Sequence, residues 1–395
     1  MPFVQAKCPN CGGMLTVDNS HDAAVCQFCN TPFIVEKAIN NYNITNNVNI
    51  GAGAIVNISA DTDSDFKIVG GVLYSYSGAS TDVIIPDTVK VIKEFVFSKC
   101  NELTSIKIPE GVKSIGHHAF DNCSGLTSIN IPDSVTSIGN HAFFRCSGLT
   151  SIHIPDGVST IEDFTFCDCA GLESINIPES VISIGRSAFS GCSNLASITI
   201  PKSLTRIGEW AFQKSGVSSI IIPDSITKIG LGAFAGSGLT NVEIGTGVTA
   251  ICERMFWGCT ELENILIPNS VSIIEQCAFR ETGLTSITIP GSIREIGYRA
   301  FFECKKLINV VIPDSVKIIG DEAFAGCTAL KQFSARQDLR KSELFFEKDN
   351  KTCSVPFWTD LVSERRGKKV CEYCGGRIVG LLNKTCSKCG RAKNY

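Results

Sequence analysis

The clearest chemistry in the sequence lies at its two ends, where cysteines come in Cys-x-x-Cys pairs. Two pairs lie near each end, and their members are Cys8, Cys11, Cys26, Cys29, Cys371, Cys374, Cys386 and Cys389. Zinc prefers four thiolates in a tetrahedron, and one tight Cys-x-x-Cys turn supplies two of them. The sequence therefore predicts one structural Zn²⁺ at each end, two in all. Both sites would be closed, without an open coordination position, so zinc catalysis is not expected.

The segments between the paired cysteines suit small β-hairpins. Residues 14–17 and 23–25 flank a polar turn near the N-terminus, and residues 377–379 and 381–382 flank Gly380 near the C-terminus. Disulfides and thioredoxin-like redox pairs are the alternatives to zinc. Disulfides need an oxidising compartment, and a redox motif would be a lone pair beside a βαβ unit, which the sequence lacks. Zinc is the favoured interpretation.

Between the two ends, an Ile-Pro step recurs every 22 or 23 residues. Its prolines are Pro86, Pro109, Pro132, Pro155, Pro178, Pro201, Pro223, Pro268, Pro290 and Pro313. Gly245 takes the place of the proline in one further unit, which makes eleven units in all. Their approximate consensus is I-x-I-P-D-S-V-T-S-I-G-x-x-A-F-x-x-C-S-G-L-T-S. A period in the twenties is typical of a solenoid, in which neighbouring units stack.

Each unit predicts two short extended segments and a corner. Ile129 and Ile131 alternate with a polar residue, which is the pattern of a strand with one buried face. Pro132 ends this strand because proline has no N–H to donate. Residues 135–139 form the second extended segment, and the corner that follows turns Phe143 inward. One unit cannot bury this face alone, so the units must stack.

A further group of cysteines belongs to the repeat itself, three residues after the inward phenylalanine. These are Cys100, Cys123, Cys146, Cys169, Cys192, Cys259, Cys304 and Cys327. Ser215, Ser237 and Thr282 replace the cysteine in units that have one residue fewer before the next strand. The alternative is a ladder of redox or metal-binding thiols, but the position recurs like a core residue, so small buried side chains are predicted. The repeat gives no role to Cys167, Cys252, Cys277 and Cys353.

On these motifs, residues 82–333 resemble the BspA-like (treponemal-type) leucine-rich repeats. The motif I-x-I-P-x-S-V-T-x-I-G-x-x-A-F-x-x-C-x-x-L matches nearly every unit; Glu162, Cys252 and Glu275 replace the glycine after isoleucine, and Gly245 replaces proline. The resemblance implies binding of a protein or ligand through a stacked sheet, without enzymatic activity. Many members of the family are secreted or surface-anchored adhesins. The two ends are similar to bacterial zinc-ribbon modules.

The predicted fold is mainly β, a leucine-rich-repeat solenoid of about eleven units flanked by two small zinc ribbons. We expect an N-terminal ribbon over 1–36, an Asn-rich linker over 37–63 and the solenoid with an N-terminal cap hairpin over 64–333. A linker with a short helix follows over 334–366, and the C-terminal ribbon occupies 367–395.

Composition and charge exclude several classes of protein. Hydrophobic residues make up 44% of the chain, and the net charge is −3, so the chain is neither disordered nor a polycation. No apolar run approaches the ~18 residues of a membrane span, and the start lacks a signal-peptide pattern. A cytoplasmic protein without membrane contact is expected. Residues 365–395 hold nine basic residues and one acid, a formal +8, so the other residues sum to −3 − 8 = −11.

The remaining candidate residues are two histidines and one strand position. His118 and His141 occupy the same slot of adjacent units and should stack about 5 Å apart; a tolerant corner position is favoured over a metal pair. The strand position between the two inward residues should form an outward face of the sheet. Its residues are Lys107, Asn130, His153, Asn176, Thr199, Ile221, Glu243, Leu266, Thr288 and Val311. This face is the best candidate for partner contact, although scattered apolar surface residues are also normal.

The sequence contains no Walker loop, GxGxxG, HExxH or GxSxG motif, so no catalytic or cofactor-binding residue is assigned. The first interpretation is a cytoplasmic, non-enzymatic scaffold that binds a protein partner through the sheet face. The second is a nucleic-acid-associated factor whose basic C-terminal ribbon contacts phosphates, although the charge also fits a solvated surface. A surface adhesin is the third.

Overall fold

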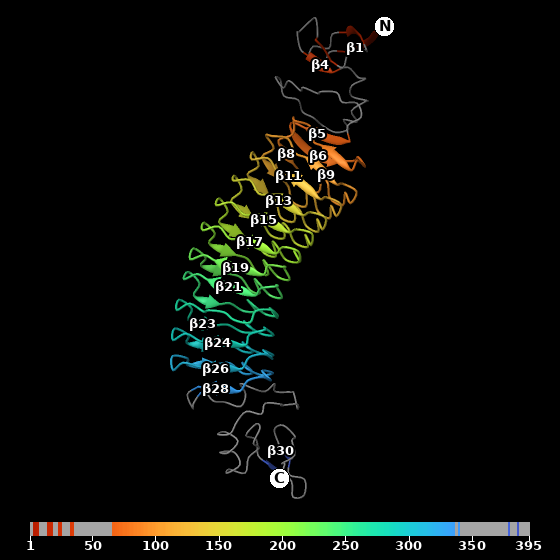
Figure 1. The fold of residues 1–395 in the computed structure, drawn as a ribbon. Helices are drawn as coiled ribbons and strands as arrows, with labels where there is room; N and C mark the ends of the chain where they lie inside the picture. The colour runs from red at the N-terminus through yellow and green to blue at the C-terminus, as the bar shows by residue number, and fades with distance from the viewer. Residues whose placement is uncertain are drawn as a thin grey trace. The chain divides into compact units, whose positions relative to one another are not determined.

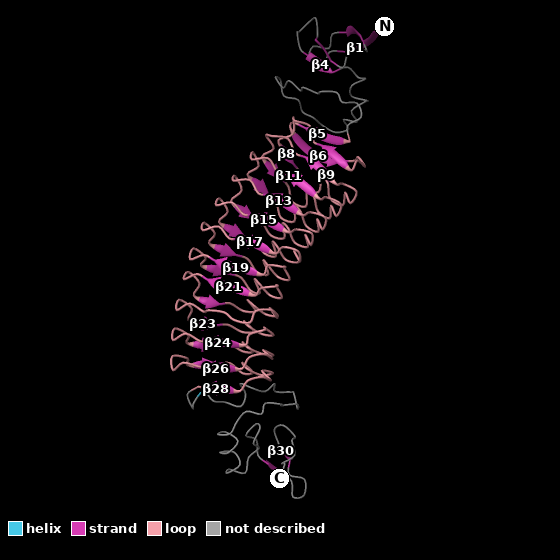
Figure 2. Cartoon of the chain, in the orientation of Figure 1, coloured by secondary structure: helices cyan, strands magenta, loops and turns pink. Residues whose placement is uncertain are grey.

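The computed structural model describes residues 3–7, 14–18, 23–25, 32–34, 65–335, 339, 378–379 and 385–386. The chain divides into two compact units, Met1–Asp65 and Phe66–Tyr395. The elements of the described residues are all β-strands (Figure 2). Within those residues, no helix has the length and apolarity needed to cross a membrane.

The N-terminal unit contains two separate strand pairs. Strand β1 (Phe3–Lys7) is antiparallel to β2 (Met14–Asp18), and β3 (Ala23–Val25) is antiparallel to β4 (Pro32–Ile34). The prediction that the strands at 14–17 and 23–25 form one hairpin is therefore wrong. The chain reverses instead across each Cys-x-x-Cys segment, so the strands before and after that segment pair with each other.

The same correction applies near the C-terminus. Strand β29 (Ile378–Val379) is antiparallel to β30 (Thr385–Cys386), so the partner of β29 lies beyond the predicted residues 381–382. Cys353 and the predicted helix of the 334–366 linker lie outside the described residues.

The repeats form a stack of turns, most of which have one strand on either side of the core (Figure 1). We call the sheet made by the first strand of each unit the front sheet. Its strands are β7 (Asp82–Ile84), β9 (Ser105–Lys107), β11 (Ser128–Asn130), β13 (Ser151–His153), β15 (Ser174–Asn176), β17 (Ser197–Thr199), β19 (Ser219–Ile222), β21 (Asn241–Ile244), β24 (Ser286–Thr288), β26 (Asn309–Val311) and β28 (Gln332–Ser334). Paired strands are parallel and in register, with Ile129 opposite Ile106 and Ile152. The front sheet is interrupted between β21 and β24, where the turn that carries Leu266 forms no front strand.

The second strand of each unit belongs to the back sheet. Its strands are β5 (Phe66–Val69), β6 (Val72–Tyr76), β8 (Val91–Ile92), β10 (Ser114–Ile115), β12 (Ser137–Ile138), β14 (Thr160–Ile161), β16 (Ser183–Ile184), β18 (Arg206–Ile207), β20 (Lys228–Ile229), β22 (Ala250–Ile251), β23 (Ile273–Ile274), β25 (Glu295–Ile296) and β27 (Ile318–Ile319). The predicted cap is confirmed, because β5 and β6 form a hairpin through Gly70 and Gly71 and β6 pairs with β8. Both glycines have positive φ angles, 56° and 78°, which a tight two-residue turn requires.

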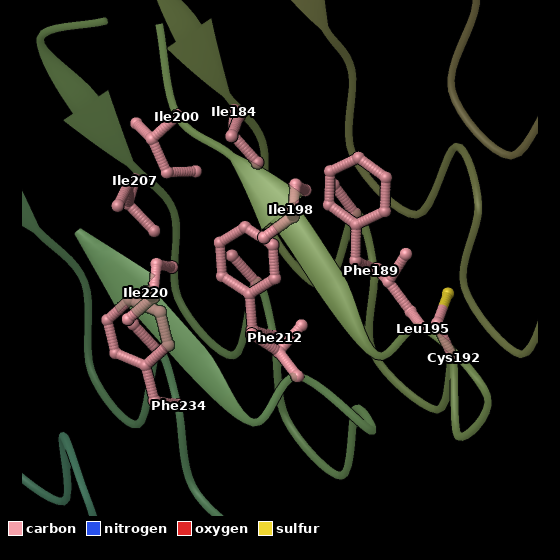
Figure 3. Packing of buried hydrophobic residues seen from close by; sticks show 14 of the residues in the cluster. Ile184, Phe189, Cys192, Leu195, Ile198, Ile200, Ile207, Phe212, Ile220 and Phe234 are labelled. Carbon is pink, nitrogen blue, oxygen red and sulfur yellow. The ribbon is translucent and has the colours of Figure 1, made fainter. Parts of the chain in front are cut away.

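A column of phenylalanines fills the core between the sheets. The rings of Phe97 to Phe324, one per unit, stack nearly parallel with centroids 5.1–5.9 Å apart. Figure 3 shows three of these rings packed against isoleucines of both sheets. Tyr76 closes one end of the column with a tilted ring, and Phe333 closes the other edge-on. The inward phenylalanine predicted from the repeat is confirmed as the centre of the fold.

The corner around each phenylalanine is held by its own hydrogen-bond ladder. His141 and Arg145, two residues before and after Phe143, have φ angles of 57° and 56° in the left-handed region. Their N–H groups donate to the carbonyls of Asp163 and Cys167 in the next turn, at 3.0 and 2.8 Å. Left-handed backbone is unfavourable for residues other than glycine. These inter-turn bonds offset that cost and repeat along the array.

Candidate interaction surface

The front side of the stack presents one row of outward side chains. All of them come from strands β7 to β26 except Leu266, whose turn forms no front strand. We call this the front row: Ile84, Lys107, Asn130, His153, Asn176, Thr199, Ile221, Glu243, Leu266, Thr288 and Val311. Every member is exposed, whereas the isoleucines and valines on either side of it point into the core. The predicted outward face is therefore confirmed. It is regular from β7 to β21 and from β24 to β28, because the strands within each of these two sheets are parallel and in register.

The first half of the front face is mostly polar; Ile84, 71% exposed, is its one apolar member of the front row. A shallow depression there is lined by Asp82, Ile84, Lys107 and Asn130 with their neighbours. The Ser105 hydroxyl donates to Asp82 Oδ1 at 2.5 Å. This bond, with a second from Thr81, lowers the pKa of the Asp82 carboxyl. The depression is open and offers hydrogen-bonding groups rather than an enclosed cavity.

The second half of the front face is more apolar. Ile221, Leu266 and Val311 are 61, 77 and 64% exposed, and they recur in every second turn. The proline two residues after each is partly exposed, as in Pro223, whereas the prolines of five earlier turns are buried. These buried prolines are Pro109, Pro132, Pro155, Pro178 and Pro201. The exposed prolines are a feature that the sequence pattern did not reveal, because the Ile-Pro step is the same in both halves.

Seven of the eight repeat cysteines are buried as predicted, and Cys100, in the first turn, is only partly buried. Cys123 is fully buried and donates its Sγ–H to the carbonyl of Phe97 in the preceding turn at 3.0 Å. In the shorter units, a hydroxyl group replaces the thiol. The Ser215 hydroxyl donates to the carbonyl of Phe212 in its own turn at 2.9 Å. Burial raises the pKa of Cys123 to about 12 and that of Cys259 to about 11. A raised pKa keeps these thiols protonated, whereas the thiolate is the reactive and metal-binding form. Their role is therefore to pack in the core.

The corner edge carries a short column of stacked rings. Phe95, His118, His141 and Phe164 follow one another with centroids 4.7, 4.4 and 4.6 Å apart. The predicted stacking of the two histidines is confirmed. Burial and then the neighbouring His118 lower the pKa of His141. Parallel stacked rings do not direct their nitrogens at one shared metal ion. His118 Nδ1 lies 3.2 Å from Asp121 Oδ2 instead. The ring column is therefore a packing feature and not a metal pair.

The back sheet is interrupted at two places, between β12 and β14 and between β20 and β22. Both breaks occur where a side chain replaces the consensus glycine, Glu162 after β14 and Cys252 after β22. In an intact turn, a Cβ on Gly208 would lie only 2.5 Å from the carbonyl carbon of Gly185. Side chains at this position therefore separate the turns. The third replacement, Glu275, follows Cys252 and leaves β22 paired with β23.

A depression accompanies the second break, lined by Arg206, Lys228, Ile229, Cys252 and Glu275 with their neighbours. Ile229 is only partly buried there, whereas the equivalent isoleucines of other turns are buried. The Cys252 thiol donates to the carbonyl of Gly230 at 3.2 Å. Burial and the charge of Glu275 raise the pKa of the Cys252 thiol to about 12. The departure of Cys252 from the consensus was visible in the sequence, but its effect on the sheet was not.

Most of the predicted zinc ligands belong to the parts of the chain that the structure does not describe. Seven of them lie outside the described residues; these are Cys8, Cys11, Cys26, Cys29, Cys371, Cys374 and Cys389. Cys386 is the last residue of β30. Across the described part of the chain, no group of three His, Cys, Asp or Glu residues is arranged to hold a metal ion.

Comparisons with known proteins agree with this architecture. A family model described as the BspA type leucine-rich repeat region (6 copies) matches residues 67–195, 159–281 and 249–358. A solved leucine-rich repeat protein from Bacteroides ovatus is 32% identical, with a TM-score of 0.54, and the match covers 70% of this chain and 82% of that one. No curated protein matches the sequence.

Two further solved structures illustrate the range of similarity. A leucine rich cell surface protein from Faecalibacterium prausnitzii is 25% identical with a TM-score of 0.34, over 68% of this chain and 91% of that one. A leucine-rich repeat protein from Eubacterium ventriosum is 21% identical with a TM-score of 0.41, over 71% of this chain and 94% of that one.

Proposed function

Because the chain belongs to the BspA-type leucine-rich repeat proteins, we propose that it is a non-enzymatic scaffold that binds a protein partner through the front sheet. The observation that carries the proposal is the front row, which is exposed in every turn and varies in chemistry while the core positions repeat. The buried thiols support a role without catalysis, because burial raises the pKa of Cys123, Cys146 and Cys169 and keeps them protonated.

The test is affinity capture with the full chain from lysate of the source organism. The double variant Ile221→Asp with Leu266→Asp places two charges on exposed positions and should fold normally. Ile182→Asp is the matched control, because Ile182 is 51% exposed next to the back sheet. We expect a defined protein to be retained by the native chain and the control, and lost with the double variant. Equal retention by all three chains would show that the front sheet is not the binding surface.

We further propose that each end of the chain holds one structural Zn²⁺. The donor set supports this, because four cysteines are available at each end. The strand pairing supports it as well: one Cys-x-x-Cys segment connects β1 with β2, and another connects β3 with β4. Two cysteine-bearing hairpin connections are the arrangement that a four-cysteine zinc site needs. Elemental analysis of protein purified under reducing conditions should find two zinc ions per chain, and one or none would refute the proposal.

A cytoplasmic location is part of the proposed scaffold function. All the cysteines of the described solenoid are free thiols, which a reducing compartment preserves. The alternative is a surface adhesin, and detection of the protein on intact cells by surface labelling would favour it. A second candidate function follows from the formal +8 of residues 365–395, which could contact nucleic acid. Capture with and without nuclease separates that candidate from protein binding.

A further inference from the structure

The second half of the front face has a periodicity of its own. Ile221, Leu266 and Val311 lie in every second turn, and Glu243 and Thr288 occupy the turns between them. All five side chains are exposed. A proline, partly exposed, follows two residues after each of the three apolar members: Pro223, Pro268 and Pro313. We call these six apolar residues the apolar strip.

The spacing of the strip can be estimated from two features of the stack. Phe212 and Phe234 have ring centroids 5.4 Å apart, and the next pair, Phe234 and Phe256, is 5.9 Å apart. Neighbouring strands of a sheet lie about 4.8 Å apart. Two turns therefore advance by about 10–11 Å, which is the distance between successive apolar members of the strip.

This distance can be compared with the spacing of side chains in the regular conformations of a peptide partner. Seven residues of α-helix rise about 10.5 Å, so side chains seven apart on a helix parallel to the stack match every second turn. An extended strand presents side chains on one face every ~6.7 Å, and a polyproline helix repeats every ~9.3 Å. From Ile221, an extended strand has no side chain of the same face near Leu266, because about 10–11 Å falls between ~6.7 and ~13.4 Å, although it meets Val311 again at ~20 Å. A polyproline helix reaches only ~18.6 Å, short of the about 20–22 Å to Val311. Fourteen residues of α-helix rise about 21 Å and match both positions.

Charge adds a second requirement on the partner. Glu243 lies within the front row between Ile221 and Leu266, and Glu263 is exposed at the start of the following unit. Asp224 and Asp314 are exposed next to Pro223 and Pro313. An anionic border of this kind favours basic side chains on the partner and speeds its association at low salt.

We propose that the apolar strip binds an amphipathic α-helix of a partner protein, with apolar residues seven apart and basic residues between them. This inference rests on the proposed function, because it names the partner of the same front sheet. The helix lies along the stack, its apolar residues contact the strip, and a lysine or arginine three or four residues after an apolar position lies near Glu243.

The test uses three fluorescent peptides of about 21 residues, equal in composition and rich in leucine, alanine and lysine, a length of about three helical repeats. One has leucine at every seventh position, one has leucine in alternation, and one is scrambled. Anisotropy titration with the full chain should give at least about tenfold tighter binding of the first peptide. Equal binding of the first and second peptides, or no binding of the first, would overturn the proposal.

Variants of the full chain locate the site. Leu266→Asp should weaken binding of the first peptide by about tenfold or more, and Glu243→Gln should weaken it and reduce its salt dependence. Ile84→Asp is the matched control, because Ile84 belongs to the same front row, is 71% exposed and lies outside the strip. Equal loss with Ile84→Asp and Leu266→Asp would refute the assignment to the strip.

The same reagents separate failure of this inference from failure of the proposed function. If a captured protein is released by the double front-face variant but its binding is not competed by the first peptide, the scaffold function stands and the helical partner is wrong. If neither a protein nor the peptide depends on the front face, both proposals are wrong.

Discussion

Replacing one glycine of the back sheet should reproduce at a chosen turn the break that Cys252 causes in the native chain. In Gly208→Ala, the new Cβ would lie 2.5 Å from the carbonyl carbon of Gly185 and 2.7 Å from the backbone nitrogen of Arg186. Real Cβ atoms do not approach backbone that closely, so the turns must separate. The N–H of Gly208 now donates to Ile184 at 2.8 Å, and that bond should be lost.

The expected cost follows from the contacts across this junction. The bond from Gly208 to Ile184 and the bond from Thr205 to Ile182, at 2.8 and 3.0 Å, both depend on the present spacing. Each contributes about 1 kcal/mol net to stability, so their loss costs about 2 kcal/mol. Ile184 of the preceding turn should also become partly exposed, as Ile229 is in the turn before Cys252, which adds about 1 kcal/mol.

Hydrogen exchange measures this local change directly, because a solenoid need not unfold as one unit. Amides of residues 205–208 should exchange about thirtyfold faster in Gly208→Ala, which corresponds to about 2 kcal/mol. Gly291→Ala is the control, because no atom lies within 4 Å of a Cβ built there; its stability should change by less than about 1 kcal/mol. Equal exchange at 205–208 in the two variants would refute the steric explanation of the sheet breaks.

Three further predictions follow from single positions. Cys146→Ala should lower the free energy of unfolding by about 1–2 kcal/mol, measured by urea denaturation, with peptide affinity unchanged, because the side chain is fully buried. Cys252→Gly should slow hydrogen exchange at residues 249–252 by restoring the consensus spacing; faster exchange there would contradict this. Burial and His118 lower the pKa of His141, so the folded state binds its proton less readily than the unfolded state. Stability should therefore fall as pH drops below about 6.5, and His141→Phe, which copies Phe164 in the next turn, should reduce that fall in melting curves recorded between pH 7 and 5.

The sequence was sufficient for the single unit because the repeat displays each structural position many times. The inward phenylalanine and the outward front row recur with the same burial, and the repeat cysteine, where present, is buried in every turn except that of Cys100, so the pattern separated core from surface. The stacked pair His118 and His141 could be predicted for the same reason, since equal positions of adjacent turns must be neighbours.

The pairing at the chain ends and the breaks in the back sheet could not be predicted in this way. The N-terminal strands were misassigned because the chain reverses across the Cys-x-x-Cys segments, and β1 precedes the first of them. At the breaks, the sequence showed Glu162, Cys252 and Glu275 as equivalent departures from glycine. Only the first two interrupt the sheet, and Glu275 leaves β22 paired with β23.

The corner edge and the front row both vary in sequence along the array, but they differ in how many of their side chains already contact one another. At the corner edge, polar and aromatic side chains contact one another: Arg299 Nε lies 2.6 Å from Glu322 Oε2, and the Arg280 guanidinium lies 4.9 Å from the centre of the Phe302 ring. A partner that binds there must first displace such contacts. The largest apolar side chains of the front row, Leu266 among them, project outward and are mostly exposed. Burying them against a partner costs no internal contact and removes apolar surface from water. This difference is the energetic reason for placing binding on the front sheet.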